Sequence, residues 1–375
     1  MGLKHFYFLV FVVTFYACGS VKNLTIDPQA NMETKILFHN LQTISKNHIL
    51  FGHQHATEYG HGWSGDSDRS DVKSVVGSHP AVIGVDFSGF SGRSQRSIDA
   101  FKEKLRENIR ATYDRGGIVT IAWHFNNPVG GRGYQWTFTD SITVVDKIIP
   151  GGSHHETYKN ILTDIGLWLQ TVKGSDGKLV PMIFRPFHEF DGSWFWWGKP
   201  QTSKDDFIAL WRFTVSHLRD TMGIHHLLYA YSPDNKFSTE DQFAERYPGD
   251  EWVDMVGMDN YGDMGRNRYA VDTAAAKLKI VSDFALKRNK LAAFTETGLE
   301  SIPNTTWWTE TLLKTLRKEK INLCYVLVWR NDQRSATHFY APFPGQVSVS
   351  DFIKFYEDDY TLFEKDLNQI YFKKM

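Results

Sequence analysis

The chain has 375 residues, a formal net charge of −1 and an aromatic fraction of 15%. This near-neutral balance gives no electrostatic reason to expect a nucleic acid or an anionic membrane surface as partner, so we expect neither. It favours a neutral substrate. The length suits one β/α barrel, a fold that runs to about 250 residues and more with insertions.

Residues 1–18 are typical of an export signal. A weakly basic start at Lys4 and His5 leads into an apolar run over residues 6–17. This run is too short to cross a bilayer, which takes about 20 residues. It ends at Ala17 and Cys18, and a small residue before such a cysteine resembles a bacterial lipobox. We therefore expect Cys18 to be lipidated; the alternative is an ordinary signal peptide with an incidental cysteine.

Gly19 and Ser20 follow the cysteine where acidic residues would argue otherwise. This favours an outer-membrane lipoprotein of a Gram-negative bacterium, facing either the periplasm or the outside. Residues 19–32 are expected to form a short polar tether, so membrane contact would run only through the lipid anchor. The one other cysteine, Cys324, lies in an apolar run, which leaves no disulfide in the mature chain. We expect a monomer.

From residue 34 onward, helical patterns alternate with short apolar runs. Eight such runs occur, at residues 49–53, 81–86, 118–123, 180–185, 227–231, 255–259, 291–296 and 324–329. Continuous apolar runs are typical of parallel strands that are buried on both faces. Helix-period segments separate most of them, at 97–115, 203–222, 270–287 and 306–318. The pattern predicts an α/β protein with a single (β/α)8 barrel over residues 33–375. No phosphate-cradling glycine loop follows the first run, which argues against a dinucleotide-binding fold.

Most of the apolar runs end in polar or aromatic residues, and active sites of such barrels lie at the carboxyl ends of the strands. The fourth and seventh runs are each associated with a glutamate, Glu189 and Glu296. Strands four and seven face one another across the mouth of an eight-stranded ring. Two carboxylates placed this way suit cleavage of a glycosidic bond, because one can protonate the leaving group while the other attacks the sugar or activates water.

Five blocks carry a family resemblance. They are Trp123–Pro128, Arg185–Glu189 with Trp194, Trp196 and Trp197, Asn260–Gly262, Thr295–Gly298, and Trp329–Asn331. Together and in this order they resemble glycoside hydrolase family 26, a family mostly of endo-β-1,4-mannanases in a clan of retaining barrels. In most related clan families an asparagine precedes the acid/base glutamate. Here it is His188, as in family 26.

The resemblance implies roles for individual residues. Glu189 would be the acid/base and Glu296 the nucleophile, with Tyr261 donating a hydrogen bond to Glu296. Trp329 would be the platform under the sugar at the cleavage point, and Trp194 would line the leaving-group side. His124 and His188 would bind sugar hydroxyls, and Arg330 would reach one sugar further out. Arg185 would lie under Glu189 and orient it or supply positive charge. Asp191 departs from the family, which usually has Asn there.

The implied reaction is double displacement on mannan, galactomannan or glucomannan, with no cofactor and no metal. Alternatives on the same scaffold are a mixed-linkage β-glucanase, a β-1,3-xylanase or an exo-acting enzyme that releases mannobiose. A remoter alternative is a non-catalytic glycan-binding lipoprotein. His53, His55 and His61 on and after the first run have spacing that a zinc site would also use; polar lining of the cleft is the reading we favour.

Overall fold

The computed structural model describes residues 24–130, 133–139, 142–318, 321–367 and 370–372. The expected export signal and Cys18 lie outside these residues. Within the described part of the chain, no helix combines the length and the apolar character needed to cross a bilayer.

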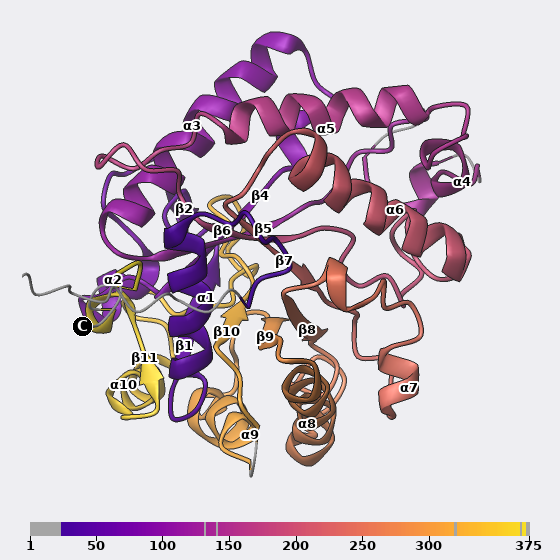
Figure 1. The fold of residues 1–375 in the computed structure, drawn as a ribbon. Helices are drawn as coiled ribbons and strands as arrows, with labels where there is room; N and C mark the ends of the chain where they lie inside the picture. The colour runs from indigo at the N-terminus through magenta and orange to yellow at the C-terminus, as the bar shows by residue number, and fades with distance from the viewer. Residues whose placement is uncertain (1–23, 131–132, 140–141, 319–320, 368–369, 373–375) are drawn as a thin grey trace, which may run out of the picture.

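Eight parallel strands close into a barrel (Figure 1). In order they are β1 (Ile49–Gln54), β4 (Val82–Asp86), β5 (Ile118–Ala122), β6 (Met182–Arg185), β7 (Leu227–Tyr231), β8 (Met255–Asn260), β9 (Leu291–Thr297) and β10 (Tyr325–Val328). Each pairs with the next, and β10 closes the ring by pairing with β1. Every strand overlaps one of the eight apolar runs, so the prediction of a single (β/α)8 barrel is confirmed.

Three short strands lie outside the ring. β2 (Tyr59–Gly60) and β3 (Trp63–Ser64) form a small hairpin after β1. β11 (Thr361–Leu362) adds to the amino-terminal end of β1, where Ile49 pairs with Thr361 and Leu50 with Leu362. In Figure 1, β11 and the last helix, both in yellow, lie beside β1.

Helices surround the strands. They are α1 (Met32–Ile44), α2 (Asp71–Val76), α3 (Gln95–Asp114), α4 (Val145–Ile148), α5 (His155–Leu169), α6 (Lys204–Ser216), α7 (Glu240–Phe243), α8 (Val271–Arg288), α9 (Lys314–Leu316) and α10 (Val349–Glu357). α6 shows how the sequence sets an end: the Ser203 side chain accepts from the Asp206 amide, and two aspartates occupy the first turn. Wider helical turns at His217–Thr221 and Trp307–Leu313 extend α6 and precede α9.

Of the expected tether, residues 24–31 are packed against the amino-terminal end of the barrel, and Met32 already begins α1. The Ile26 amide donates to Asp254 Oδ1 at 2.8 Å, and Asp254 immediately precedes β8. The Asn31 amide donates to the His225 carbonyl at 2.8 Å, and its side chain caps α1. This segment therefore lies at the amino-terminal ends of the strands, on the face opposite to the carboxyl ends.

Candidate active site

A cleft of about 380 Å³ opens at the carboxyl ends of the strands. It is lined by Glu189, Trp194, Asp234, Asn235, Lys236, Tyr261, Gly262, Arg266, Asn267, Glu296, Trp329, His338 and Tyr340. Both predicted glutamates thus line one cleft, as expected for carboxylates that follow strands four and seven of a barrel.

Glu296 lies inside β9, close to its carboxyl end. The pairing of β8 with β9 shifts there: Met258 pairs with Phe294, but Asp259 pairs with Glu296. Thr295 is the extra residue of a β-bulge, and bulges next to active sites redirect side chains. The Thr295 hydroxyl donates to Asp259 Oδ1 at 2.7 Å, which ties the bulge to the neighbouring strand.

Glu189 lies four residues beyond the end of β6 in a loop with unusual backbone geometry. Phe187 and Glu189 have φ values of 51° and 54°, in the left-handed region that non-glycine residues rarely adopt. The Glu189 amide donates to the Ser232 carbonyl at 2.9 Å, which holds the loop against the segment after β7. Surroundings that fix such backbone conformations cluster at functional sites.

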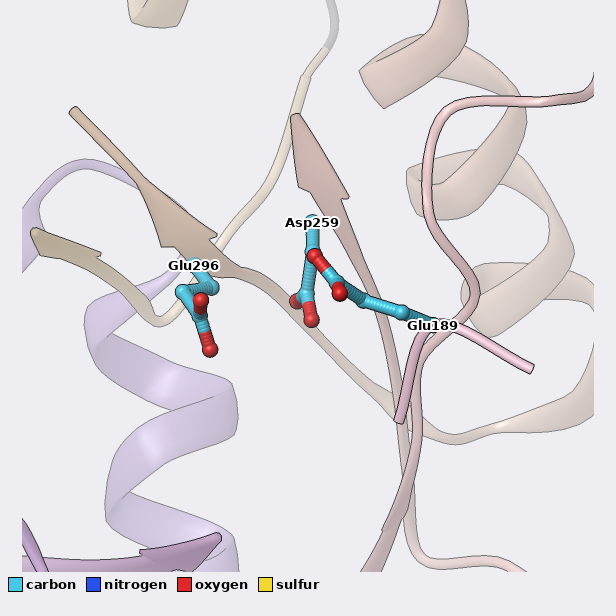
Figure 2. A group of neighbouring side chains, drawn as sticks. All are labelled: Glu189, Asp259 and Glu296. Carbon is cyan, nitrogen blue, oxygen red and sulfur yellow. The ribbon is translucent and has the colours of Figure 1, made fainter. Parts of the chain in front are cut away.

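A third acidic residue joins the two glutamates. Figure 2 shows Glu296 and Asp259 on neighbouring strands, with Glu189 entering from the loop. One carboxylate oxygen of each of the three lies within 4.8 Å of one oxygen of the others. Among the described residues these form the one group of potential ligands that converges enough to hold a metal. Arg185 already bonds two of its members, however, which favours a charge network over a metal site.

The position of Arg185 corrects one expectation. The sequence interpretation places this residue beneath Glu189, but its guanidinium contacts the other two carboxylates: Nη1 donates to Asp259 Oδ2 at 2.6 Å and Nη2 to Glu296 Oε2 at 2.5 Å. The physical reason is strand geometry. Arg185 is the last residue of β6 and is buried where it meets residues of β8 and β9, whereas Glu189 lies in the loop that follows β6. Burial disfavours the charge, but both carboxylates outweigh it and raise the pKa of Arg185.

Tyr261 holds the second oxygen of Glu296. Its hydroxyl donates to Glu296 Oε1 at 2.7 Å, the contact that the resemblance implies. Burial and the neighbouring Glu296 raise the pKa of Tyr261 well above its usual range, so the phenol keeps its proton and acts as a donor. Glu296 therefore receives one strong donor at each oxygen, an arrangement that stabilises and orients a negative carboxylate.

Glu189 lies in the opposite electrostatic environment. Burial, then the charges of Glu296 and Asp259, raise its pKa well above the ordinary value for a glutamate. Trp194 Nε1 donates a hydrogen bond to Glu189 Oε2 at 2.6 Å. Trp194 itself is 37% exposed. A carboxyl with a raised pKa beside a carboxylate that accepts a hydrogen bond at each oxygen suits the division of labour between acid and nucleophile in glycosidic cleavage.

The adjacent aromatic residues support this loop from below. Trp196 and Trp197 are fully buried, and their indole nitrogens donate to the carbonyls of Phe125 and His188, each at 2.8 Å. The two tryptophans therefore pack the loop onto the barrel and do not face the cleft.

Burial, Arg185 and His124 lower the pKa of His188 well below its usual value, so that this imidazole is neutral.

A second hollow of about 350 Å³ adjoins the first, since the Trp329 ring lines both. Its other lining residues are His55, Asp86, Ser88, His124, Tyr134, Arg330 and His338. Arg330 is braced by Asp332 at 2.8 Å. The structure thus brings His124, Trp329 and Arg330 together around this second hollow, while Trp194 lines the first cleft beside Glu189.

The three histidines on and after the first strand do not form one group. His55 lines the second hollow and contacts Glu58 at 3.1 Å. His53 is buried inside the barrel, where burial and His55 lower its pKa to about 3. His61 stacks on Phe343 with ring centroids 3.7 Å apart. The expectation of polar cleft lining therefore fits His55 alone.

Sequence reasoning missed several residues of this site. Asp259 is the second-last residue of β8, two positions before Tyr261, so the rule that found the glutamates also points to it. Tyr340 and His338 lie in an irregular segment after β10, where no periodic pattern marks them.

Asp191, the departure from the family pattern, accepts hydrogen bonds from the backbone amides of Asp234 and Lys236 at 2.6 and 3.1 Å. It braces the loop after β7 without touching either glutamate.

Comparison with known proteins places this geometry in a family. The model of glycosyl hydrolase family 26 matches residues 26–340. A mannan endo-1,4-beta-mannosidase of Bifidobacterium adolescentis is 33% identical over 92% of this chain, which spans only 36% of that longer protein. A mannan endo-1,4-beta-mannosidase of Bacillus subtilis strain 168 is 27% identical, with 83% of both chains covered.

Solved structures agree with the sequence comparison. A GH26 beta-mannanase from Bacteroides ovatus superimposes with a TM-score of 0.85 at 41% identity, covering 92% of this chain and 98% of the other. GH26C from Muricauda sp. MAR_2010_75 gives a TM-score of 0.86 at 35% identity, covering 93% and 96%. With a family model that spans most of the barrel and relatives above 30% identity over nearly all of it, the chain belongs to glycosyl hydrolase family 26.

Proposed function

We propose that this chain is a retaining endo-β-1,4-mannanase that acts on mannan, galactomannan or glucomannan by double displacement. The observation that carries the proposal is the pairing of Glu189 and Glu296 in one cleft, with one carboxylate oxygen of each within 4.8 Å of one oxygen of the other, which leaves little room for a water between them. Retaining enzymes have carboxyl groups about 5–5.5 Å apart, whereas inverting enzymes need about 6.5–9.5 Å to admit water. Family membership and relatives named as mannan endo-1,4-beta-mannosidases support the substrate.

In the proposed first step, Glu296 attacks the anomeric carbon while Glu189 gives its proton to the departing glycosidic oxygen. A covalent glycosyl-enzyme forms and the leaving chain departs on the side of Trp194. In the second step Glu189, now ionised, takes a proton from water as that water attacks the anomeric carbon and frees Glu296. Arg185 and Tyr261 hold Glu296 in position throughout.

Two variants test the roles. Glu296→Ala should abolish turnover of mannan, and Glu189→Ala should slow it strongly, least for substrates with an activated leaving group that needs no protonation. Added azide should rescue Glu189→Ala and yield a β-glycosyl azide. Glu310→Ala, an exposed glutamate on the outer helix, is the matched control and should keep full activity. Near wild-type hydrolysis by Glu296→Ala would refute the assignment.

A substrate panel separates this function from its alternatives. Galactomannan, barley β-glucan and β-1,3-xylan are digested side by side, and reducing ends and product lengths are followed over time. An endo-mannanase releases mixed manno-oligosaccharides from the first minutes and lowers the viscosity of galactomannan early. Proton NMR of the first products should show the β-anomer. Mannobiose alone, release from another polymer, or binding without any product would replace the proposal with the corresponding alternative.

We also propose that Cys18 is lipidated and anchors the enzyme to the outer membrane. The lipobox-like residues Ala17-Cys18-Gly19 after an apolar run support this. Labelled palmitate fed to expressing cells should enter the wild-type chain and not Cys18→Ala. Protease treatment of intact cells then distinguishes the periplasmic from the outward-facing orientation. Label that persists in Cys18→Ala would exclude this anchor.

A further inference from the structure

Asp86 is the last residue of β4, and its side chain contacts His124, which lines the second hollow. Its Oδ2 lies 2.5 Å from His124 Nδ1, while its Oδ1 accepts the backbone amides of His124 at 3.2 Å and Ser88 at 2.6 Å. Strand register brings this about, because Asp86 pairs with Ala122 of β5 and His124 follows two residues later. One buried carboxylate thus holds both the main chain and the ring of His124.

The ring of His124 is packed among other rings. Its centroid lies 4.8 Å from that of Tyr134, 4.7 Å from that of His188 and 5.6 Å from that of Trp329. Such packing fixes the plane and place of an imidazole. It does not decide which nitrogen carries the proton, because that choice depends on hydrogen-bond partners. The side-chain partner of Nδ1 is Asp86, so this carboxylate is the group on which the choice of tautomer depends.

The other nitrogen of His124 is left for the substrate. Within the described residues Nε2 has no hydrogen-bond partner, and His124 lines the hollow that adjoins the catalytic cleft at Trp329. Three charged or titratable side chains lie around Asp86 and His124. They are His55, which contacts Glu58; Arg330, which contacts Asp332; and His188, which is neutral. Burial alone would raise the pKa of Asp86, but the contacts with His124 and the nearby His55 outweigh it, so the pKa of Asp86 is lowered.

We propose that Asp86 is a positioning residue of the reaction: it keeps the His124 proton on Nδ1 and so presents Nε2 to a hydroxyl of the sugar that lies over Trp329. This inference rests on the proposed function for its substrate. Its structural half, the protonation of His124, holds or fails in the free enzyme.

Asp86→Asn tests it with little change of shape. The amide oxygen can still accept the two backbone N–H groups, while the amide nitrogen can only donate to Nδ1 and so drives the proton to Nε2. In ¹⁵N-histidine-labelled protein without substrate, His124 is assigned as the signal that disappears in His124→Gln. Its Nδ1 should resonate as a protonated nitrogen in the wild type and as an unprotonated one in Asp86→Asn. An unprotonated Nδ1 in the wild type overturns the proposal.

Kinetics tests the second half. Asp86→Asn should lower kcat/KM on manno-oligosaccharides about tenfold, the effect of one disrupted hydrogen bond to substrate. In the His124→Gln background the same change should have less than about a twofold effect, since both residues act through one contact. Equal losses in both backgrounds would show that Asp86 acts by another route. If the wild type cleaves no mannan, the proposed function fails, yet the NMR result still decides the role of Asp86.

Discussion

At the scale of single residues, each carboxylate oxygen of Glu296 accepts a hydrogen bond from one side chain. The Tyr261 hydroxyl is one of the two donors, at 2.7 Å. Tyr261→Phe removes this hydrogen bond to a charged group, a loss of about 1.5–3 kcal/mol, and should lower kcat roughly ten- to a hundredfold. Steady-state kinetics on galactomannan measures the effect. Tyr269→Phe is the control, because Tyr269 is 52% exposed and does not line the cleft. Equal losses in the two variants would contradict the role given to Tyr261.

The raised pKa of Glu189 has a consequence for pH dependence. Its raised pKa arises from burial first and then from the negative charges of Glu296, Asp259 and Asp234. A general acid must hold its proton, so loss of this proton sets the basic limb of the kcat/KM profile. Asp234→Asn removes one negative charge, lowers the pKa of Glu189 and should move the basic limb to lower pH, with the acid limb in place.

The dependence of kcat/KM on pH is measured for the wild type and for Asp234→Asn over the full pH range. Asp241→Asn, on the exposed side of α7, removes the same charge far from the cleft and should leave both limbs unchanged. A basic limb that stays in place in Asp234→Asn would mean that another group sets it.

At the scale of elements, the bulge in β9 sets the direction of Glu296. Gly257 of β8 faces this bulge, and a Cβ there would lie 2.4 Å from Thr295 Cγ2 and 2.7 Å from Thr295 Oγ1. Gly257→Ala should therefore displace Thr295, cost about 1–3 kcal/mol of unfolding free energy and reduce activity. Adding Thr295→Ser, which removes the crowded methyl group, should recover part of both. Urea unfolding and kinetics provide the measurements; unchanged stability in Gly257→Ala would contradict the account.

The sequence predicts the strands and the two glutamates at their ends, but it does not predict the contacts between strands. The eight strands follow from continuous apolar runs, and the two glutamates from their places after runs four and seven. The partners of Arg185 do not follow, because they depend on which strand faces which across the barrel and on a bulge at Thr295. The contact between Asp86 and His124 needs the register of two strands. Tyr340 lies on an irregular segment with no local signal at all.

At the scale of the whole molecule, the carboxy-terminal segment completes the barrel wall. The family model matches up to residue 340, yet α10 and β11 follow and cover Phe51 of β1. The Phe51 ring centroid lies 5.5 Å from that of Phe352, 5.6 Å from that of Phe355 and 5.1 Å from that of Phe363. This aromatic cluster joins the last part of the chain to its first strand.

Phe363→Ala should cost about 3–5 kcal/mol of unfolding free energy, because Phe363 is fully buried in this cluster. Urea unfolding followed by tryptophan fluorescence measures the loss, and kcat at 25 °C should stay near the wild-type value since the cleft lies at the other end of the strands. Phe372→Ala, at 51% exposure, should change stability by less than about 0.5 kcal/mol. A similar effect of both variants would argue against the cluster.

The packing of residues 24–31 beneath the barrel bears on how the enzyme can be mounted. Ile26 is bonded to Asp254 at the amino-terminal ends of the strands, and the cleft opens at their carboxyl ends. A bead, electrode or scaffold coupled ahead of Leu24 would begin from the underside of the molecule. The cleft would then point outward, where it is open to a polymer that is too large to diffuse into a matrix.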